Sequence, residues 1–355
     1  MKRIVKQVAG IDVAQKELVV CIGRIDEELE IELYAHKTFA NTQKGFTALT
    51  EWINRHTAKE SSLRFVMEAT GVYHEELAYY LNDQGCSISI VLPNKISSYF
   101  KTLDVKTITD KTSSQTIAQF GLERKLENWH PPRGVYKKLR QLTRERDQIV
   151  QERTVVKNQL HAEQAEAGPH KQTIKRINQR IALLDKQDKE VQAELAALIK
   201  DDEDMQSMLV ILCSIPGIGL LTAAIVLAET NGFDLIRNKR QLASYAGFDV
   251  KEKESGTSVK GKPKISKRGN KYLRKAMHLP ALSAIRHDER FKAIFVRLVS
   301  KHGIKMKAAV AVQRKLLEMM FTLASKKEKY DKAYLNTQQI KQNIEYENDQ
   351  IELKN

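Results

Sequence analysis

The chain has 355 residues, with 59 Lys and Arg against 44 Asp and Glu, which gives a formal net charge of +15 at pH 7. This excess predicts an acidic polymer as partner, although a basic enzyme with a small substrate would also show it. No stretch has the about 20 apolar residues of a membrane span, and no signal peptide is visible, so we expect a cytoplasmic protein with no membrane partner. Cys21, Cys86 and Cys213 lack metal-ligand spacing and are expected to be core residues in a reducing compartment.

The first third of the sequence alternates between β-rich runs and amphipathic runs. Residues 6–11, 18–25 and 30–39 are expected to be strands. A helix capped by Thr42 follows, and then a strand, a helix closed by Gly85, a strand, and a helix from about Thr109 to Gly121. This order is that of a ribonuclease-H-like α/β domain, and other α/β folds share parts of it.

The middle of the chain has a heptad pattern in two stretches separated by Gly168 and Pro169, with Arg146 and Arg153 in its gaps. The apolar positions are Val135, Leu139, Leu142, Ile149, Val156 and Leu160, then Ile174, Ile177, Ile181, Leu184, Val191, Leu195 and Leu198. Such a narrow seam predicts a coiled coil that closes on itself as a hairpin or pairs with another subunit. Alternatively, the two helices are a solvated spacer. We favour assembly through them into a homo-oligomer, a dimer or a tetramer.

From about Met205 two apolar helices flank the string "SIPGIG", which resembles the turn of a helix-hairpin-helix. Glycines such as Gly217 and Gly219 let backbone N–H groups approach a phosphate at the start of the next helix. An ordinary tight turn between two core helices would give the same string. Helices continue to about Lys329, and the polar tail after Tyr330 is expected to be loosely ordered.

Three acids occupy positions suited to a metal site. Asp12 ends the first apolar strand, Glu68 ends the strand "FVME", and Asp110 opens a helix. Neighbouring strands would bring the first two acids to one edge of the sheet, where carboxylates repel unless a cation lies among them. Mg²⁺ accepts carboxylate, water and phosphate oxygens, and such ions assist attack at a phosphodiester. Alternatively, each acid is a turn or cap residue, and Asp110 in particular could be only a helix N-cap.

The segment "KEKESGTSVKGKPKISKRGNKYLRK" is strongly basic and predicts a phosphate-binding surface. Its cations are Lys260, Lys262, Lys264, Lys267, Arg268, Lys271, Arg274 and Lys275. Ser255 and Gly256 would let a hydroxyl approach a backbone closely. Because no His is adjacent to activate the serine, the segment alone does not predict a catalyst.

Seven strings together resemble one family, the DEDD-type transposases of the insertion-sequence "one-ten" family, which are related to the pilin-gene invertases. They are "GIDVAQ", "MEATGVYHEELAYYL", "TDKTSSQTIAQFG", "IPGIGLLTAAIVLAE", "LASYAGF", "SGTSVKGKPKISKRGNKYLRKAM" and "VQRKLLEMM". The resemblance implies a RuvC-like domain with four acids, a coiled coil, and a C-terminal domain with a nucleophilic serine. Asp12, Glu68 and Asp110 match three of the acids, and Ser255 matches the serine.

The resemblance further implies composite sites between subunits, at which the acids and the serine act together and the serine forms a covalent link to DNA. It also implies a structured guide RNA that pairs with target and donor DNA, so that the protein reads backbone and shape. The fourth acid should follow Asp110 by three residues, but Ser113 occupies that position, and a hydroxyl is a weak ligand for a hard cation. Asp104 is the nearest spare acid.

The sequence thus predicts four parts: a RuvC-like metal-binding domain (1–128), a coiled coil (129–200), a helical transposase domain with the catalytic serine (201–330) and a polar tail (331–355). The expected function is a DNA transposase or recombinase. The alternatives are a site-specific invertase, a catalytically weakened nucleic-acid-binding copy and a junction nuclease that uses the acids alone.

Overall fold

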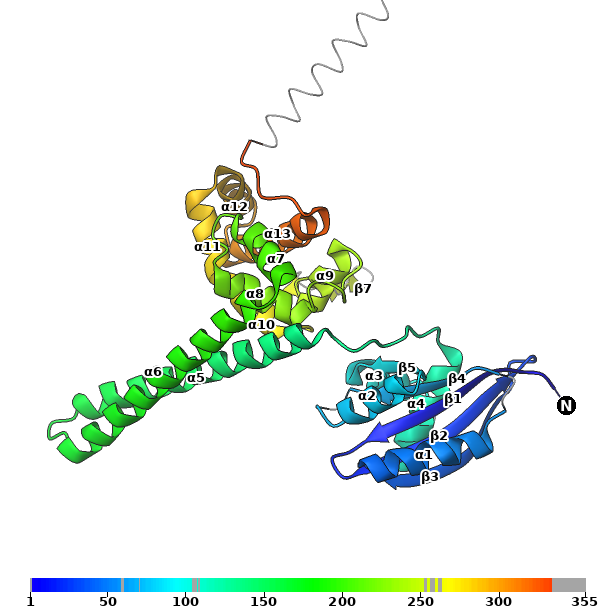
Figure 1. The fold of residues 1–355 in the computed structure, drawn as a ribbon. Helices are drawn as coiled ribbons and strands as arrows, with labels where there is room; N and C mark the ends of the chain where they lie inside the picture. Colours follow the sequence, from blue (N-terminus) through cyan, green and yellow to red (C-terminus); the bar gives the residue numbers. More distant parts are fainter. Residues whose placement is uncertain are drawn as a thin grey trace, which may run out of the picture. The chain divides into compact units, whose positions relative to one another are not determined.

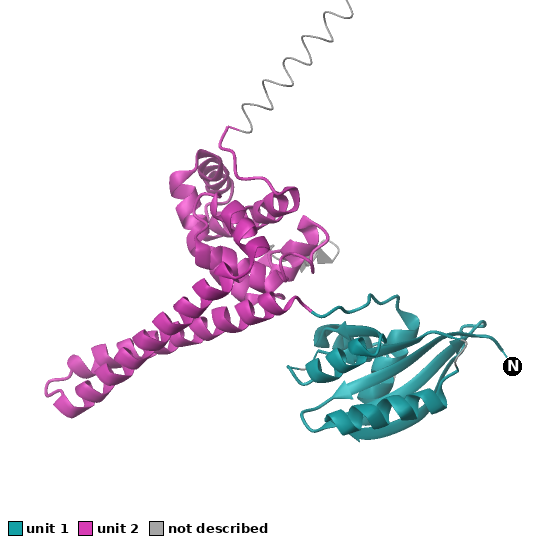
Figure 2. Cartoon of the chain, viewed as in Figure 1, with its two compact units in different colours: residues 1–131 teal, residues 132–355 magenta. Residues whose placement is uncertain are grey.

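The computed structural model describes residues 2–58, 61–69, 71–103, 107, 109–251, 254–255, 259–260 and 264–333. The chain divides into two compact units, residues 1–131 and 132–355 (Figure 2), and each is described by itself. No helix in these described ranges is long and apolar enough to cross a bilayer.

Unit 1 is built around a five-stranded mixed sheet (Figure 1). Its elements are β1 (Ile4–Val13), β2 (Glu17–Asp26), β3 (Ile31–Ala40), α1 (Gln43–His56), β4 (Leu63–Glu68), α2 (Glu75–Asp83), β5 (Ser87–Val91), α3 (Pro93–Phe100) and α4 (Asp110–Glu123). The strand order is β3-β2-β1-β4-β5, with β2 antiparallel to β1 and β3, and with β1, β4 and β5 parallel. This is the order of a ribonuclease-H-like domain, as predicted.

Two apolar layers cover the sheet of unit 1. On one face, α1 and α2 pack through side chains such as Phe46 and Leu77. On the other face, α3 and α4 pack through side chains such as Tyr99 and Ile117. The sheet is therefore buried on both faces along β1 and β4, whereas the edge strand β3 keeps exposed side chains such as Lys37.

Most element limits in unit 1 agree with the local signals in the sequence. The Thr42 hydroxyl accepts a hydrogen bond from the backbone N–H of Gly45 at 3.3 Å and caps α1, and Gly85 follows α2 with a φ of +71°. One helix, α3, was not predicted, although Pro93 at its first position favours a helix start.

In unit 2, two long helices, α5 (Gly134–Gln164) and α6 (Lys171–Lys200), pack along each other as a hairpin (Figure 1). Heptad residues of both helices are buried, among them Leu139, Ile149, Leu184 and Val191. The helices break at Gly168 and Pro169 as expected. Two gaps in the seam are occupied by an ionic cluster, because buried Asp188 pairs with Arg146 at 2.8 Å and with Arg153 at 3.3 Å. The pattern thus closes within one chain.

The rest of unit 2 is a helical domain, as expected for this part of the chain. Its helices are α7 (Glu203–Cys213), α8 (Leu220–Thr230), α9 (Lys239–Ala246), α10 (Lys271–Ala276), α11 (His278–His287), α12 (Glu289–His302) and α13 (Lys305–Lys326). The basic segment was expected to be a loop but contains two short antiparallel pairings. They join β6 (Val250–Lys251) to β9 (Lys264–Ile265), and β7 (Glu254–Ser255) to β8 (Val259–Lys260).

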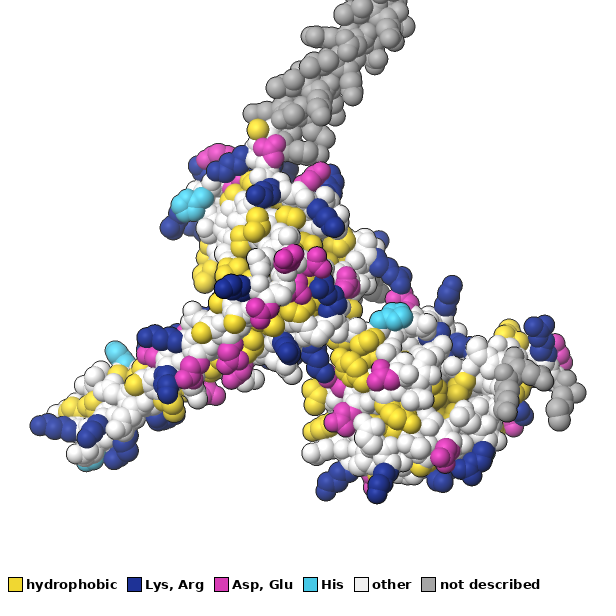
Figure 3. All heavy atoms as spheres, in the orientation of Figure 1, with side chains coloured by type: hydrophobic (Ala, Val, Ile, Leu, Met, Phe, Trp, Pro, Cys, Tyr) yellow, Lys and Arg dark blue, Asp and Glu magenta, His cyan; other side chains and the backbone are white. Residues whose placement is uncertain are grey.

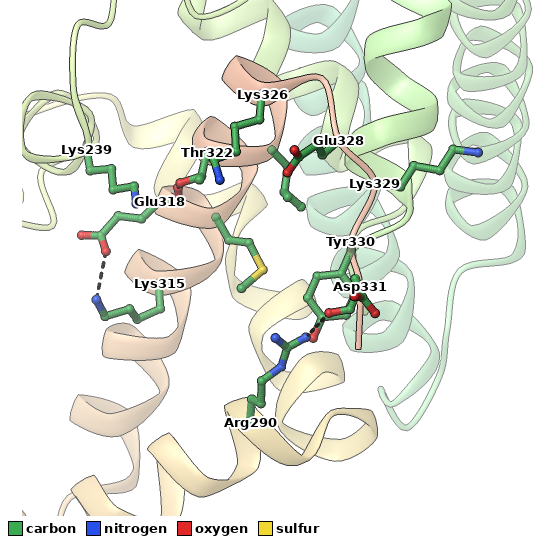
Figure 4. Close-up of a pocket in the computed structure, with 12 residues that line it drawn as sticks. Lys239, Arg290, Lys315, Glu318, Thr322, Lys326, Glu328, Lys329, Tyr330 and Asp331 are labelled. Carbon is green, nitrogen blue, oxygen red and sulfur yellow. Dashed lines mark hydrogen bonds and ion pairs between the residues drawn. The ribbon is translucent and has the colours of Figure 1, made fainter. Parts of the chain in front are cut away.

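After α13 the chain crosses back over the helical domain (Figure 4). This segment, residues 327–331, is called the strap and carries Tyr330 and Asp331. The Tyr330 N–H donates to the Ser214 hydroxyl at 2.8 Å, and its phenol donates to Asp288, the N-cap of α12. Arg290 lies over the Tyr330 ring, 4.5 Å from its centroid. Burial and the bond to Asp288 raise the pKa of Tyr330 to about 12. Tyr330 therefore joins α7 to α12, and the tail expected after it lies, from residue 334, outside the described residues.

Candidate functional site

The first group of predicted site residues lies at the carboxyl ends of β1 and β4. These strands are parallel neighbours, and Ile11 pairs with Met67. Asp12 and Glu68 are the next residues of the two strands, on the face opposite to Ile11 and Met67. The two acids therefore end adjacent strands on the same face of the sheet, and this is the α4 face.

Helix α4 approaches β1 unusually closely because of two glycines. A Cβ on Gly10 would lie 2.2 Å from the Ala118 nitrogen and 2.6 Å from the Ser114 carbonyl oxygen. A Cβ on Gly121 would lie 2.8 Å from a methyl group of Val8. The backbone of α4 therefore packs directly on the backbone of β1 at Gly10, which only glycine allows. Gly10 lies two residues before Asp12.

The close packing brings the first turn of α4 to Asp12. Thr109 is the N-cap, and its hydroxyl accepts from the Thr112 N–H at 3.2 Å in a capping box. The alternative that Asp110 is only an N-cap is therefore wrong, because Asp110 is the exposed first residue of the helix. Ser113, one turn later, lies near enough to lower the pKa of the Asp12 carboxyl.

The surroundings of Asp12 oppose its negative charge. Burial, and then the charges of Asp110 and Glu68, raise the pKa of Asp12 from 3.8 to about 6. Hydrogen bonds from the Val13 backbone and from the Ser113 hydroxyl act in the opposite direction, but they are smaller. The fold therefore holds three carboxylates near one another at a cost in electrostatic energy.

Carboxylate oxygens in mutual repulsion are the donor set that a hard divalent cation neutralises. Asp12, Glu68 and Asp110 supply these oxygens, and Ser113 adds a neutral one. Within the described residues no three acidic, His or Cys side chains already stand in a metal-holding arrangement. The acids therefore fit a divalent cation by chemistry, and they would have to close around it. Asp104, the spare acid, lies outside the described residues.

The second group of predicted site residues lies in unit 2. The backbone of Ser255 pairs with that of Val259 in the β7–β8 pairing, next to Glu254 and Lys260. Lys264, Lys267 and Arg268 are exposed, as a phosphate-binding surface requires. Lys262 lies outside the described residues, as do Gly256–Ser258. Figure 3 shows Lys and Arg side chains spread over the visible surface of both units.

Arg274 has a structural contact besides its predicted contact with phosphate. It is half-buried, and its Nη1 donates to the carbonyl oxygens of Ala246 at 2.7 Å and Asn270 at 3.3 Å. Nearby, Gly269 has a φ of +157°, and a Cβ on it would lie 2.5 Å from the Tyr245 oxygen. The end of the basic segment is thus fixed against α9, and it can present its cations in a defined place.

The string "SIPGIG" forms the turn between α7 and α8. Gly217 has a φ of +86°, and a Cβ there would lie 2.6 Å from the Pro280 carbonyl oxygen of α11, so this glycine is required for packing. Gly219 is the N-cap of α8 and has open space where a Cβ would be. Of the two, Gly219 leaves the helix N-terminus accessible.

The sequence reasoning missed a polar cluster in unit 2, formed by Glu229, Arg144 and Asn270. The Glu229 side chain is 1% exposed and accepts from Arg144 at 2.7 and 2.8 Å and from Asn270 at 2.6 Å. The Arg144 guanidinium lies 4.6 Å from the centroid of the Tyr272 ring. An acid in the apolar helix "LLTAAIVLAET" was the available signal, because a buried charge needs a partner.

Two family models match the chain, and both describe transposases. Residues 9–165 match a transposase model of the DEDD type, and residues 210–295 match the model described as transposase IS116/IS110/IS902 family. The chain therefore resembles the transposases of this insertion-sequence family in both units, which confirms the resemblance inferred from its motifs.

Curated relatives agree with the family models. The pilin gene-inverting protein of Moraxella bovis is 28% identical over 331 residues, 92% of this chain and 98% of that protein. The transposase for insertion sequence element IS1111A of Coxiella burnetii is 31% identical over 123 residues, 33% of each chain. Among solved structures, Thermus thermophilus RuvC is 11% identical and covers 35% of this chain and 99% of its own, with a TM-score of 0.27, a likeness too low to carry an argument.

Proposed function

We propose that the protein is a DNA recombinase of the transposase type, which cuts and rejoins strands with Ser255 as nucleophile and a divalent cation, Mg²⁺, held by Asp12, Glu68 and Asp110. The observation that carries the proposal is the placement of Asp12 and Glu68 at the carboxyl ends of two neighbouring parallel strands, with Asp110 in the first turn of the helix that packs on β1. A bound cation would neutralise carboxylates gathered in this way. The family matches support this reaction class, and the exposed cations of the basic segment support a DNA-binding role for it.

The chemistry follows from these groups. A bound divalent cation would polarise a phosphodiester and stabilise charge that develops on its oxygens. The Ser255 oxygen bonds to phosphorus, the bridging P–O bond breaks, and the released strand end leaves as a hydroxyl after taking a proton. The serine loses its own proton to a base. A strand hydroxyl then reverses the step on new DNA and frees the serine, so that no water is consumed.

The partners in this proposal are target and donor DNA, a structured guide RNA and further copies of the chain. The guide RNA and the copies rest on the resemblance. Val155 and Leu183, each 55% exposed on the α5–α6 hairpin, are available for contact with another copy as a coiled coil. The cytoplasmic location stays a prediction.

Covalent capture of DNA tests the nucleophile. Purified protein, its RNA and a labelled donor are quenched in denaturant, and adducts are separated by gel. Adducts should form with the parent and be absent with Ser255→Ala, whereas nucleic-acid binding and the unfolding midpoint stay unchanged. Equal adducts from Ser255→Ala would point to another hydroxyl, such as that of Ser258. Cleavage without any adduct would instead favour the junction nuclease.

A second candidate is a site-specific invertase with the same chemistry. It is favoured by the match along 98% of a pilin gene-inverting protein, whereas the transposase IS1111A match covers 33%. Recombination that requires an added structured RNA supports the transposase. Inversion between two sites on one plasmid without RNA supports the invertase. A third candidate, a weakened binding copy, is favoured by Ser113 at the fourth position, and binding without recombination would identify it.

A further inference from the structure

A cavity of about 790 Å³ lies in unit 2 between the root of the hairpin and the helical domain, and the function proposed above assigns it no role. It is bounded by α5, α8, α10, α11 and the start of α13. Its volume falls in the range of small-molecule and cofactor sites. Two predicted nucleic-acid-binding regions lie next to the cavity. Its lining includes Leu221, two residues after Gly219, and Lys267 at the end of the basic segment.

The cavity has a cationic side. Five cations line it against two acids: Arg144, Arg146, Lys267, Arg274 and Lys275 against Asp147 and Glu229. Three of these cations are paired, Arg144 with Glu229, Arg146 with Asp188, and Lys275 with Asp147. Lys267 and Arg274 form no ion pair with an acid of the described chain, so the cavity keeps uncompensated positive charge. An anionic group is therefore the ligand that this side would attract.

Helices α8, α11 and α13 line the cavity with apolar side chains, which form its apolar side. Leu221, Leu279 and Met306 line it and are 38%, 73% and 60% exposed. Pro280 and Val310 lie deeper. Exposed large hydrophobic residues gathered at one recess mark a binding surface rather than random exposure. A double-helical backbone has no apolar group to fill such a recess, whereas an unpaired base does.

On the cationic side, Arg144 provides a fixed planar group. Glu229 holds its guanidinium by two hydrogen bonds, Tyr272 lies along it, and 40% of the side chain remains exposed. A guanidinium held in one orientation loses little entropy when a base stacks on it. Asn270 donates a hydrogen bond to the same Glu229 carboxylate. Its amide oxygen accepts from two backbone N–H groups and so caps the start of α10.

We propose that this cavity binds one unpaired nucleotide of a nucleic-acid strand, with the base between the Arg144 guanidinium and the Leu221–Leu279 side, and the phosphate at Lys267 and Arg274. The inference deepens the function proposed above and rests on it. It predicts that the protein distinguishes strands with an extruded or single-stranded base from continuous duplex, as recombination intermediates and structured RNA require. A partner protein on the apolar side is the competing occupant.

Binding by the full-length protein tests the inference. The probes are a fluorescein-labelled 20-nucleotide oligothymidylate and a 20-base-pair duplex, and the variant is Leu221→Ala with Leu279→Ala. The variant should bind the oligothymidylate about tenfold more weakly, the order of one lost base stack, and the duplex within about twofold of the parent. The matched control, Leu29→Ala with Leu235→Ala, changes leucines that are 74% and 47% exposed outside the cavity and should bind both probes like the parent.

The outcomes separate the two proposals. A parent that binds neither probe refutes nucleic-acid binding and the cavity with it. A parent that binds both, with a variant weakened equally for both or for neither, refutes the cavity alone. If the variant binds oligothymidylate normally but sediments as a smaller assembly, the apolar side is a protein contact and the inference is wrong.

Photocrosslinking gives an independent readout. An oligothymidylate with one central 5-iodouracil is irradiated with the parent, and the crosslinked peptide is identified by mass spectrometry. The crosslink should map to Tyr272 or Met306, which line the cavity. Crosslinks confined to unit 1 would overturn the assignment.

Discussion

Replacing Asp12 by Asn should make unit 1 more stable at neutral pH, the opposite of most changes in a folded domain. The substitution removes the charge that the fold opposes but keeps the size of the side chain. An amide oxygen can still accept the hydrogen bonds of the Val13 backbone and the Ser113 hydroxyl.

The magnitude follows from the raised pKa of Asp12. A rise from 3.8 to about 6 is equivalent to about 3 kcal/mol. Because the side chain is only half-buried, solvent screening reduces this to about 1–2 kcal/mol. In a domain of this size, that raises the unfolding midpoint by about 3–8 °C.

The sign depends on pH. The folded state holds the Asp12 proton more tightly than the unfolded state, so the parent loses stability as pH rises from about 3.8 through about 6. The gain from Asp12→Asn should therefore be full at pH 7.5 and nearly absent at pH 4. Bound Mg²⁺ should reverse the order at pH 7.5, because it stabilises the parent and has no intact site in Asp12→Asn.

Tryptophan fluorescence is the assay, since Trp52 and Trp129 are the only two tryptophans and both belong to unit 1. Thermal unfolding is followed at pH 4 and 7.5, with and without MgCl₂. A variant less stable than the parent at pH 7.5 would refute the electrostatic reasoning. An equal response of parent and variant to MgCl₂ would refute the metal site while leaving that reasoning intact.

Three further changes probe other parts of the structure. Ser113→Asp should tighten Mg²⁺ binding measured by calorimetry, since it adds a carboxylate beside Asp12, and unchanged affinity would show that the fourth position does not touch the ion. Gly10→Ala should cost about 3 kcal/mol or more in the tryptophan-detected transition, because its methyl group would meet the α4 backbone, and a loss below about 1 kcal/mol would contradict that packing. Asp188→Ala should lower the unfolding midpoint of unit 2, followed by circular dichroism, by the equivalent of about 3 kcal/mol, because it leaves Arg146 without its buried partner, whereas Arg153 keeps Asp185 at 2.8 Å. No change would mean that the cluster contributes nothing to stability.

Local and periodic signals account for the parts of the fold that the sequence predicts. The strands of unit 1, the α1 cap at Thr42 and the break at Pro169 each depend on a few neighbouring residues. The meeting of Asp12 with Glu68 was also predictable, because parallel neighbouring strands end at one edge. The position of Ser113 followed from one helical turn after Asp110.

Contacts between distant segments were not predictable in this way. Nothing near Gly10 indicates that α4, over 100 residues later, packs on it. Arg144 lies in the heptad helix α5, and its pairing with Glu229 joins residues 85 positions apart. Asp188 likewise has no local signal for its arginine partners. The basic segment lacks strand periodicity, so its two short pairings were missed.

The strap that carries Tyr330 sets an order of assembly during synthesis. A ribosome releases the chain from its N-terminus, so Ser214 and Asp288 exist long before the residue that joins them. Tyr330 makes the hydrogen bonds that connect the end of α7 to the start of α12. This contact is therefore among the last of the domain to form, although α7 leads into the "SIPGIG" turn. A translation product that a nonsense codon or a frameshift ends after Gln313 but before Tyr330 would carry every residue of the cavity and of the acid cluster, yet lack this contact.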